Sequence, residues 1–164
     1  MRTQASAVEV SREAPQVQAW AQLLRAHSAL TRRFTSELLE RHGLTLNDYE
    51  VLLQLAYAPD RRLRRVDLAD RILLTPSGIT RLLAGLERAG YVGRATCDSD
   101  ARVTYAVLTD EGYEKLQQSA PTHVGGIHQV FADRFSEPEL QVLAGLLERL
   151  PAVDAPDCDP PEPE

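Results

Sequence analysis

The feature that most constrains the fold of this chain is a change in hydrophobic period about 90 residues from its start. Before it, apolar residues recur at helical spacing in two short segments, 66–73 and 75–89, separated by a tight turn. After it, residues 91–96 and 103–108 are β-prone and alternate with period 2 around a polar turn. Two short helices followed by a hairpin predict a helix-turn-helix with a β wing.

The second of these helices carries the most informative surface. Thr75 is a good N-cap, Pro76 suits the first helical position, and Gly90 is expected to end the helix. The buried stripe is predicted to consist of Ile79, Leu82, Leu83 and Leu86. The outward-facing residues are predicted to be Ser77, Thr80, Arg81 and Arg88. An outward face of small, polar and arginine side chains is typical of a helix that reads DNA.

A further helix precedes this pair. Thr45 and Asp48 form a capping-box-like start, and Pro59 closes the helix. Its buried face is predicted to hold Tyr49, Leu52, Leu53 and Ala56. We interpret Arg61–Arg65 as a short basic connector with Leu63 as its apolar anchor. In the helix that follows this connector, the residues expected to face inward are Leu68, Ala69, Ile72 and Leu73.

Long amphipathic segments flank this lobe on both sides. One runs from Pro15 to a stop at Gly43, and another from the Thr109 cap to about Phe135. Pro121 and the two glycines after it are expected to kink or loosen the second segment. A last helix begins with the capping box at 136–139 and ends at Pro151. A small lobe cannot cover these apolar faces, so we expect a twofold pair of chains, with packing inside a monomer as the alternative.

The predicted fold is therefore mainly α with a small β-hairpin wing, a winged helix-turn-helix lobe carried on long terminal helices. We expect a flexible N-terminal arm over 1–13, dimerisation helices over 14–44 and 110–150, and the DNA-binding lobe over 45–109. Residues 151–164 are acidic and proline-rich, a composition that predicts a disordered tail.

The net charge of −6 is unusual for a nucleic-acid-binding protein, but it is unevenly distributed. The last fourteen residues hold five acids and no base, whereas residues 61–102 hold nine Arg and five acids, a net of +4. A local basic zone is sufficient for phosphate contact, although an ordinary solvated arginine-rich face has the same charge. Arg64 and Arg65, directly before the first short helix, are candidates for clamping phosphate.

An ordered set of short motifs resembles the MarR family of bacterial regulators. The wing motif is Asp100-Ala101-Arg102, then Val107-Leu108-Thr109, then Gly112. Upstream, the runs 77–82 and 86–92, with Arg94 two residues later, match as well. The resemblance covers roughly residues 15–150. Ala101 departs from it, because many relatives carry a second basic residue there, and this weakens the expected wing contacts without removing them.

The resemblance implies an obligate dimer whose terminal helices form the interface. It places Ser77, Thr80 and Arg81 in the major groove and Arg102, at the wing tip, in the minor groove. Arg94 and Asp100 are implied to brace the base of the wing, which leaves Arg102 free. The full set of expected DNA-binding residues is Arg64, Arg65, Thr75, Ser77, Thr80, Arg81 and Arg102.

The sequence thus predicts a DNA-binding transcriptional regulator. We expect a homodimer that binds a pseudo-palindromic double-stranded operator. The family resemblance implies that it represses transcription until a small-molecule ligand releases it. The residues that would bind the ligand are not identified. No apolar run in the first 30 residues suggests a signal peptide or a transmembrane helix, so a cytoplasmic protein with no membrane partner is expected.

Two other functions stay open, a redox-sensing regulator through Cys97 beside the wing and a helical adaptor that does not bind DNA. An enzyme is disfavoured, because the chain has no HExxH, no phosphate-cradling glycine loop, no CxxC and no nucleophile elbow. His123 and His128 are five residues apart, on different faces of a helix, and so are poorly placed to bind zinc. No cofactor and no metal are expected.

Overall fold

The computed structural model describes residues 14–96 and 103–150. Its elements, in chain order, are α2 (Pro15–His42), α3 (Leu46–Tyr57), η1 (Pro59–Arg61), β1 (Arg62–Arg64), α4 (Arg65–Arg71), α5 (Pro76–Arg88), β2 (Val92–Thr96), β3 (Thr104–Leu108), α6 (Asp110–Ala132) and α7 (Glu137–Leu147). The chain is mainly helical with one small antiparallel sheet, which confirms the predicted fold class.

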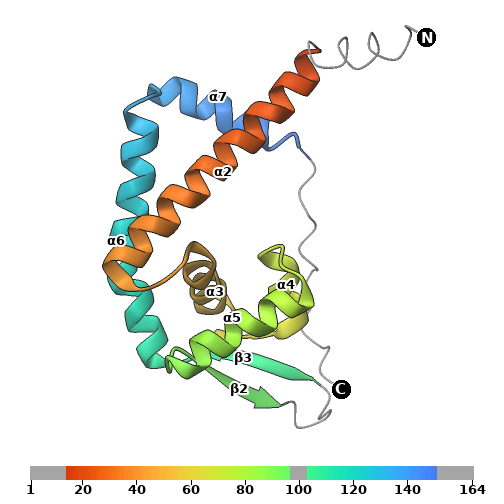
Figure 1. Ribbon diagram of the computed structural model, residues 1–164, viewed down its shortest axis with the longest axis vertical. Coiled ribbons are helices and arrows are strands. Elements are labelled where there is room, and N and C mark those ends of the chain that lie inside the picture. The colour runs from red at the N-terminus through yellow and green to blue at the C-terminus, as the bar shows by residue number, and fades with distance from the viewer. Residues whose placement is uncertain (1–13, 97–102, 151–164) are drawn as a thin grey trace, which may run out of the picture.

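The helices near the two ends of the chain stand apart from a smaller lobe (Figure 1). Helices α2 and α6 pack against each other, and α7 follows at the far end of α6. The lobe holds α3, α4, α5 and the sheet. As predicted, α2 begins at Pro15 and ends where Gly43 adopts the left-handed conformation, with φ of 68°.

Helix α3 is the centre of the lobe. It starts with the predicted capping box, in which the Asp48 amide donates to Thr45 Oγ1 and the Thr45 amide donates to the Asp48 carboxylate. Val51 and Leu55 are fully buried, whereas Leu53 is only partly buried. The prediction of one buried face was therefore incomplete, because α3 contacts α2, α4, α5, α6 and the sheet and buries more than a single stripe.

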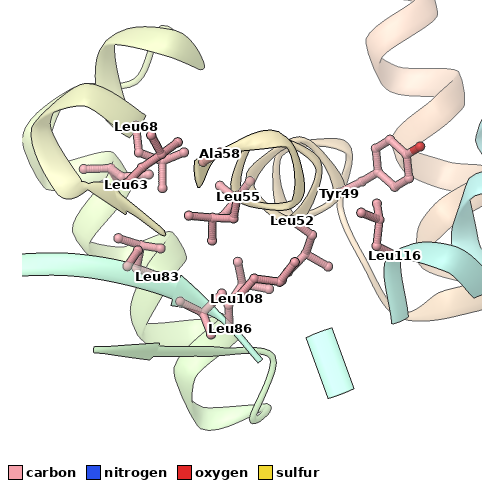
Figure 2. Packing of buried hydrophobic residues seen from close by; sticks show 14 of the residues in the cluster. Tyr49, Leu52, Leu55, Ala58, Leu63, Leu68, Leu83, Leu86, Leu108 and Leu116 are labelled. Atoms are coloured by element: carbon pink, nitrogen blue, oxygen red, sulfur yellow. The ribbon is translucent and has the colours of Figure 1, made fainter. Parts of the chain in front are cut away.

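A leucine-rich core joins the elements of the lobe around α3 (Figure 2). Leu63 of β1, Leu68 of α4 and Leu83 of α5 meet the α3 residue Leu55 at one end of this core. At the other end the core continues to Leu116 of α6, so the long helix shares its packing with the lobe.

The sheet has three strands in the order β1-β3-β2, all antiparallel. The interpretation of Arg61–Arg65 as a plain connector was wrong, because Arg62–Arg64 is a strand in which Leu63 lies opposite Ala106. Strands β2 and β3 confirm the predicted hairpin. The turn between them, with Cys97, Asp100 and Arg102, lies outside the described residues.

The remaining differences between the predicted and the observed structure lie at or near the ends of helices. Leu73 was predicted to face inward but is 70% exposed, because its φ of 54° turns the chain away from the core at the end of α4. Helix α6 continues through Pro121 and the glycine pair, where a kink or loosening was expected. It ends at Ala132 rather than near Phe135. Helix α7 has the predicted capping box at its start but ends at Leu147, before Pro151.

Candidate nucleic-acid interface

Helix α5 is held in the lobe by one side and presents the other to solvent. Thr75 Oγ1 accepts a hydrogen bond from the Gly78 amide at 3.1 Å and caps the helix as predicted. Ile79, Leu83 and Leu86 are buried on the inner side, and Leu82 is partly buried beside them. Three buried anchors over two turns leave the helix no freedom to rotate, so its outer face is defined.

The outer face of α5 carries the residues predicted to contact DNA. Ser77, Thr80 and Arg81 are all exposed. The Thr80 hydroxyl donates to the Pro76 carbonyl oxygen at 2.8 Å, which leaves its oxygen able to accept. Among the described residues, Arg81 has no carboxylate partner, whereas Arg88 Nε donates to the Ala84 carbonyl oxygen at 3.1 Å. The Arg81 guanidinium is thus available for a ligand outside the chain.

An ion pair joins α5 to the wing. Arg94, in the middle of β2, donates from Nε to Glu87 Oε1 at 2.7 Å, and a second contact joins its terminal nitrogen to the other carboxylate oxygen. This hydrogen bond and the charge of Glu87 raise the pKa of Arg94. The partner implied by the family resemblance, Asp100, lies outside the described residues. Sequence reasoning missed Glu87, although opposite charges on the two sides of the Gly90 turn were a usable signal.

Breaking this pair is expected to weaken DNA binding more than it weakens folding. Glu87→Gln and Arg94→Gln should each lower duplex affinity severalfold with little change in Tm, because partly exposed pairs contribute little to stability but fix orientation. The exchanged pair Glu87→Arg with Arg94→Glu should regain part of the affinity. Glu40→Gln, on the exposed side of α2, is the control for loss of one acid. Equal losses of affinity and Tm in the single variants would contradict the orienting role.

The two arginines predicted to clamp phosphate lie at the β1–α4 boundary. Arg64 Nε donates to Asp67 at 2.7 Å, and Asp67 is buried, so this guanidinium is partly engaged by α4. One terminal nitrogen of Arg65 is buried without a hydrogen-bond partner among the described residues. Arg61 extends toward α6, where it binds Asp110 at 3.1 Å and lies over the Tyr113 ring. Phosphate contact by Arg64 and Arg65 stays a prediction.

Comparison with known proteins agrees with this architecture. A model of the MarR family matches residues 42–103. The crystal structure of Sco3205, a MarR family transcriptional regulator from Streptomyces coelicolor in complex with DNA, is similar with a TM-score of 0.74 and 34% sequence identity. The similarity covers 80% of this chain and 82% of Sco3205. The chain belongs to the MarR family of transcriptional regulators.

Two curated relatives extend the comparison. An uncharacterised HTH-type transcriptional regulator from Bacillus anthracis is 30% identical over 132 residues, which span 80% of this chain and 85% of that protein. The HTH-type transcriptional repressor YetL from Bacillus subtilis (strain 168) is 36% identical over 111 residues, 66% of each chain. Both relatives are named as regulators, and the second as a repressor.

The structure explains the roles of Leu108, Thr109 and Gly112, which follow one another closely at the end of the wing. Leu108 is buried in the core, and Thr109 Oγ1 accepts from the Gly112 amide and donates to the Gly90 carbonyl oxygen at 2.8 Å. A Cβ at position 112 would overlap the Tyr91 carbonyl oxygen. The first turn of α6 therefore lies directly against the chain that links α5 to β2. This MarR junction, Gly90–Tyr91 with Thr109–Gly112, connects the long helix to the end of the candidate reading helix.

None of the described helices combines the length and the sustained apolar character needed to cross a membrane.

Proposed function

We propose that the chain is a sequence-specific double-stranded DNA-binding regulator whose helix α5 enters the major groove. The observation that carries this proposal is the exposed polar face of α5, which includes Arg81 and is fixed in place by the buried stripe beside the wing. The net charge of +4 over residues 61–102 supplies the attraction to phosphate. The DNA complex of the similar regulator Sco3205 supports the same use of the fold.

Each candidate residue has a role in this proposal. Ser77 and Thr80 contact phosphate or base edges near the start of α5, and Arg81 binds a guanine edge or a phosphate. Arg102 enters the minor groove, where the potential is most negative. Thr75 offers its hydroxyl and the free amides of the helix start to phosphate, and Arg64 and Arg65 add contacts beyond it.

The proposal includes a homodimer built from α2, α6 and α7. Large apolar side chains on these helices are exposed, among them Trp20, Leu24, Val124, Val142, Leu146 and Leu147. No residue of α7 is buried, although the helix is rich in leucine and valine. A groove of about 530 Å³ runs along the start of α2 beside Val17 and Ala21. A second copy of the chain would cover this surface and place two α5 helices on one face of a duplex.

Repression is the regulatory mode that we propose, since the similar protein YetL is named a transcriptional repressor. Release by a small molecule belongs to the same proposal. A ligand can release DNA only if it binds more tightly to an arrangement of the two lobes that does not fit the duplex. The ratio of the ligand's affinities for the two arrangements limits how far the ligand can shift the protein away from DNA.

Footprinting upstream of the gene for this protein tests the proposal. Protection of two half-sites about one helical turn apart is expected. Affinity for that duplex should fall steeply with salt, by a factor of about 10³ between 50 and 200 mM if about six phosphates are contacted. No protection, or an affinity that does not depend on salt, would favour the helical adaptor instead.

A further inference from the structure

His123 of α6 lies where α6 meets both α2 and α3, between the long helices and the lobe. The Phe34 ring of α2 stands edge-on to the imidazole at 5.2 Å, and the Tyr49 ring of α3 is 4.7 Å away. Nδ1 of His123 is buried and has no hydrogen-bond partner among the described residues. The imidazole is thus held between two aromatic rings from different parts of the fold with one nitrogen unsatisfied.

Two carboxylates, Glu37 and Glu50, act electrostatically on this ring. Glu37 of α2 accepts from Arg33 at 2.8 Å and packs against α6 at Gly126, one turn beyond His123. Glu50 of α3 accepts from Gln54 at 3.1 Å. Burial lowers the pKa of His123, and the charges of Glu50 and Glu37 oppose this to a smaller extent. The neutral form of the ring is therefore favoured in this packing, and its Nδ1 is hydrogen-bonded to neither carboxylate.

A second histidine ties the same helices together. His42, at the end of α2, shares a hydrogen bond of 2.8 Å with the Thr122 hydroxyl, next to His123. Burial, Lys115 and Arg41 lower the pKa of His42. Both histidines at the α2–α6 contact thus favour neutral imidazole.

We propose that His123 is a proton-binding site, and that its protonation opens the contact between α2, α3 and α6 and weakens DNA binding. This inference rests on the proposed function.

The physical reason is the position of Nδ1. A protonated ring carries a charge and an N–H on both nitrogens, so Nδ1, which has no hydrogen-bond partner in this packing among the described residues, would have to donate. The ring finds a partner for its charge and for the Nδ1 N–H by reaching toward Glu37 or Glu50. That movement takes it out from between Phe34 and Tyr49. Tyr49 belongs to the core of the lobe and Phe34 to a long helix. Their separation would shift the lobe relative to the dimer helices and change the distance between the two α5 helices.

The direction of the pH dependence follows from the coupling between protonation of His123 and the contact of the three helices. When His123 lies between Phe34 and Tyr49, its pKa is lower than the ordinary value of 6.5. This closed arrangement of α2, α3 and α6 is therefore fully favoured above pH 6.5. Its advantage is lost as the pH falls through the lowered value. General electrostatics predicts the opposite trend for DNA affinity, because acid makes a chain of net charge −6 less negative. A loss of affinity in acid is therefore diagnostic of a specific group.

The experiment measures the affinity for the footprinted duplex at about pH 7.5 and about pH 5.5 at constant ionic strength. We expect wild-type protein to bind severalfold more weakly at the lower pH, because His123 takes up a proton more readily when the contact is open than when DNA holds it closed. His123→Phe keeps an aromatic ring but cannot be protonated, and its affinity should fall much less than that of wild type, with His42 the remaining histidine at the α2–α6 contact. His128→Phe, at an exposed site on the same helix, is the matched control and should behave like wild type.

Equal pH dependence in wild type and His123→Phe would overturn the inference, as would a wild-type affinity that does not fall in acid. Failure to bind at about pH 7.5 would instead overturn the proposed function. If His123→Phe does not fold, an NMR titration of the His123 ring in wild-type protein decides the question. A lower pKa with DNA bound than without it supports the inference, and equal values overturn it.

Discussion

Gly112→Ala is expected to destabilise the fold by about 3 kcal/mol, the upper end of the usual range for overpacking a core. The new methyl group would overlap the Tyr91 carbonyl oxygen and lie 2.9 Å from Leu108 Cδ1. Relief requires a shift of the chain between α5 and β2 or of the first turn of α6. The Thr109 hydroxyl already binds both sides of this MarR junction, so neither can move without losing hydrogen bonds.

Gly125→Ala is the matched control for this prediction. Gly125 lies on the same helix, is exposed, and has no atom within 4 Å of the place that a Cβ would take. Alanine there should raise stability by about 0.5–1 kcal/mol through helix propensity. Urea unfolding of the three proteins gives both differences. Similar stabilities for Gly112→Ala and wild type would show that the close junction does not constrain α6.

Arg81→Ala is expected to abolish most operator binding while leaving the fold intact. A bidentate base contact contributes about 1–3 kcal/mol of discrimination, and a twofold dimer makes it twice. Made twice, this is about 2–6 kcal/mol, so a loss of at least about 30-fold is expected. The side chain is exposed and has no carboxylate partner among the described residues, so unfolding midpoints should not change.

The control for Arg81→Ala is Arg41→Ala, which removes the same charge from an exposed position at the end of α2. It should change affinity only slightly. The two roles open to Arg81 are separated by salt: loss of a phosphate contact lowers the salt slope by about one per site, whereas loss of a base contact relaxes specificity. Equal affinities of Arg81→Ala and Arg41→Ala would contradict the placement of α5 in the groove.

Local signals in the sequence predicted most helix starts, because capping is local chemistry. Thr45, Thr75, Thr109 and Ser136 cap their helices as expected, and Gly43 ends α2. Strand β1 was missed because three residues are too few for a period, and the strand exists through its pairing with β3, more than 40 positions later. Leu55 was missed because its burial depends on how many neighbours surround α3.

In the candidate site, too, features set by local sequence were predicted and features set by tertiary contacts were missed. The outward face of α5 follows from helical spacing alone, so its exposed residues were predictable. The partner of Arg94 was missed, because Glu87 approaches it only through the turn at Gly90, although the opposite charges on the two sides of that turn were a usable signal. The sequence around His123 gives no sign of its packing between Phe34 and Tyr49, because that packing depends on three helices meeting. Tertiary neighbours of this kind leave no pattern in a single sequence.

The central claim is that two copies of this chain place their α5 helices on one duplex. Sedimentation of the purified protein with a labelled duplex from the footprinted region measures this directly. We expect a complex with the mass of one duplex and two chains of 18.2 kDa each, formed in a single step at salt concentrations where unrelated DNA is not bound. A monomer in solution, or one chain per duplex at saturation, would contradict it.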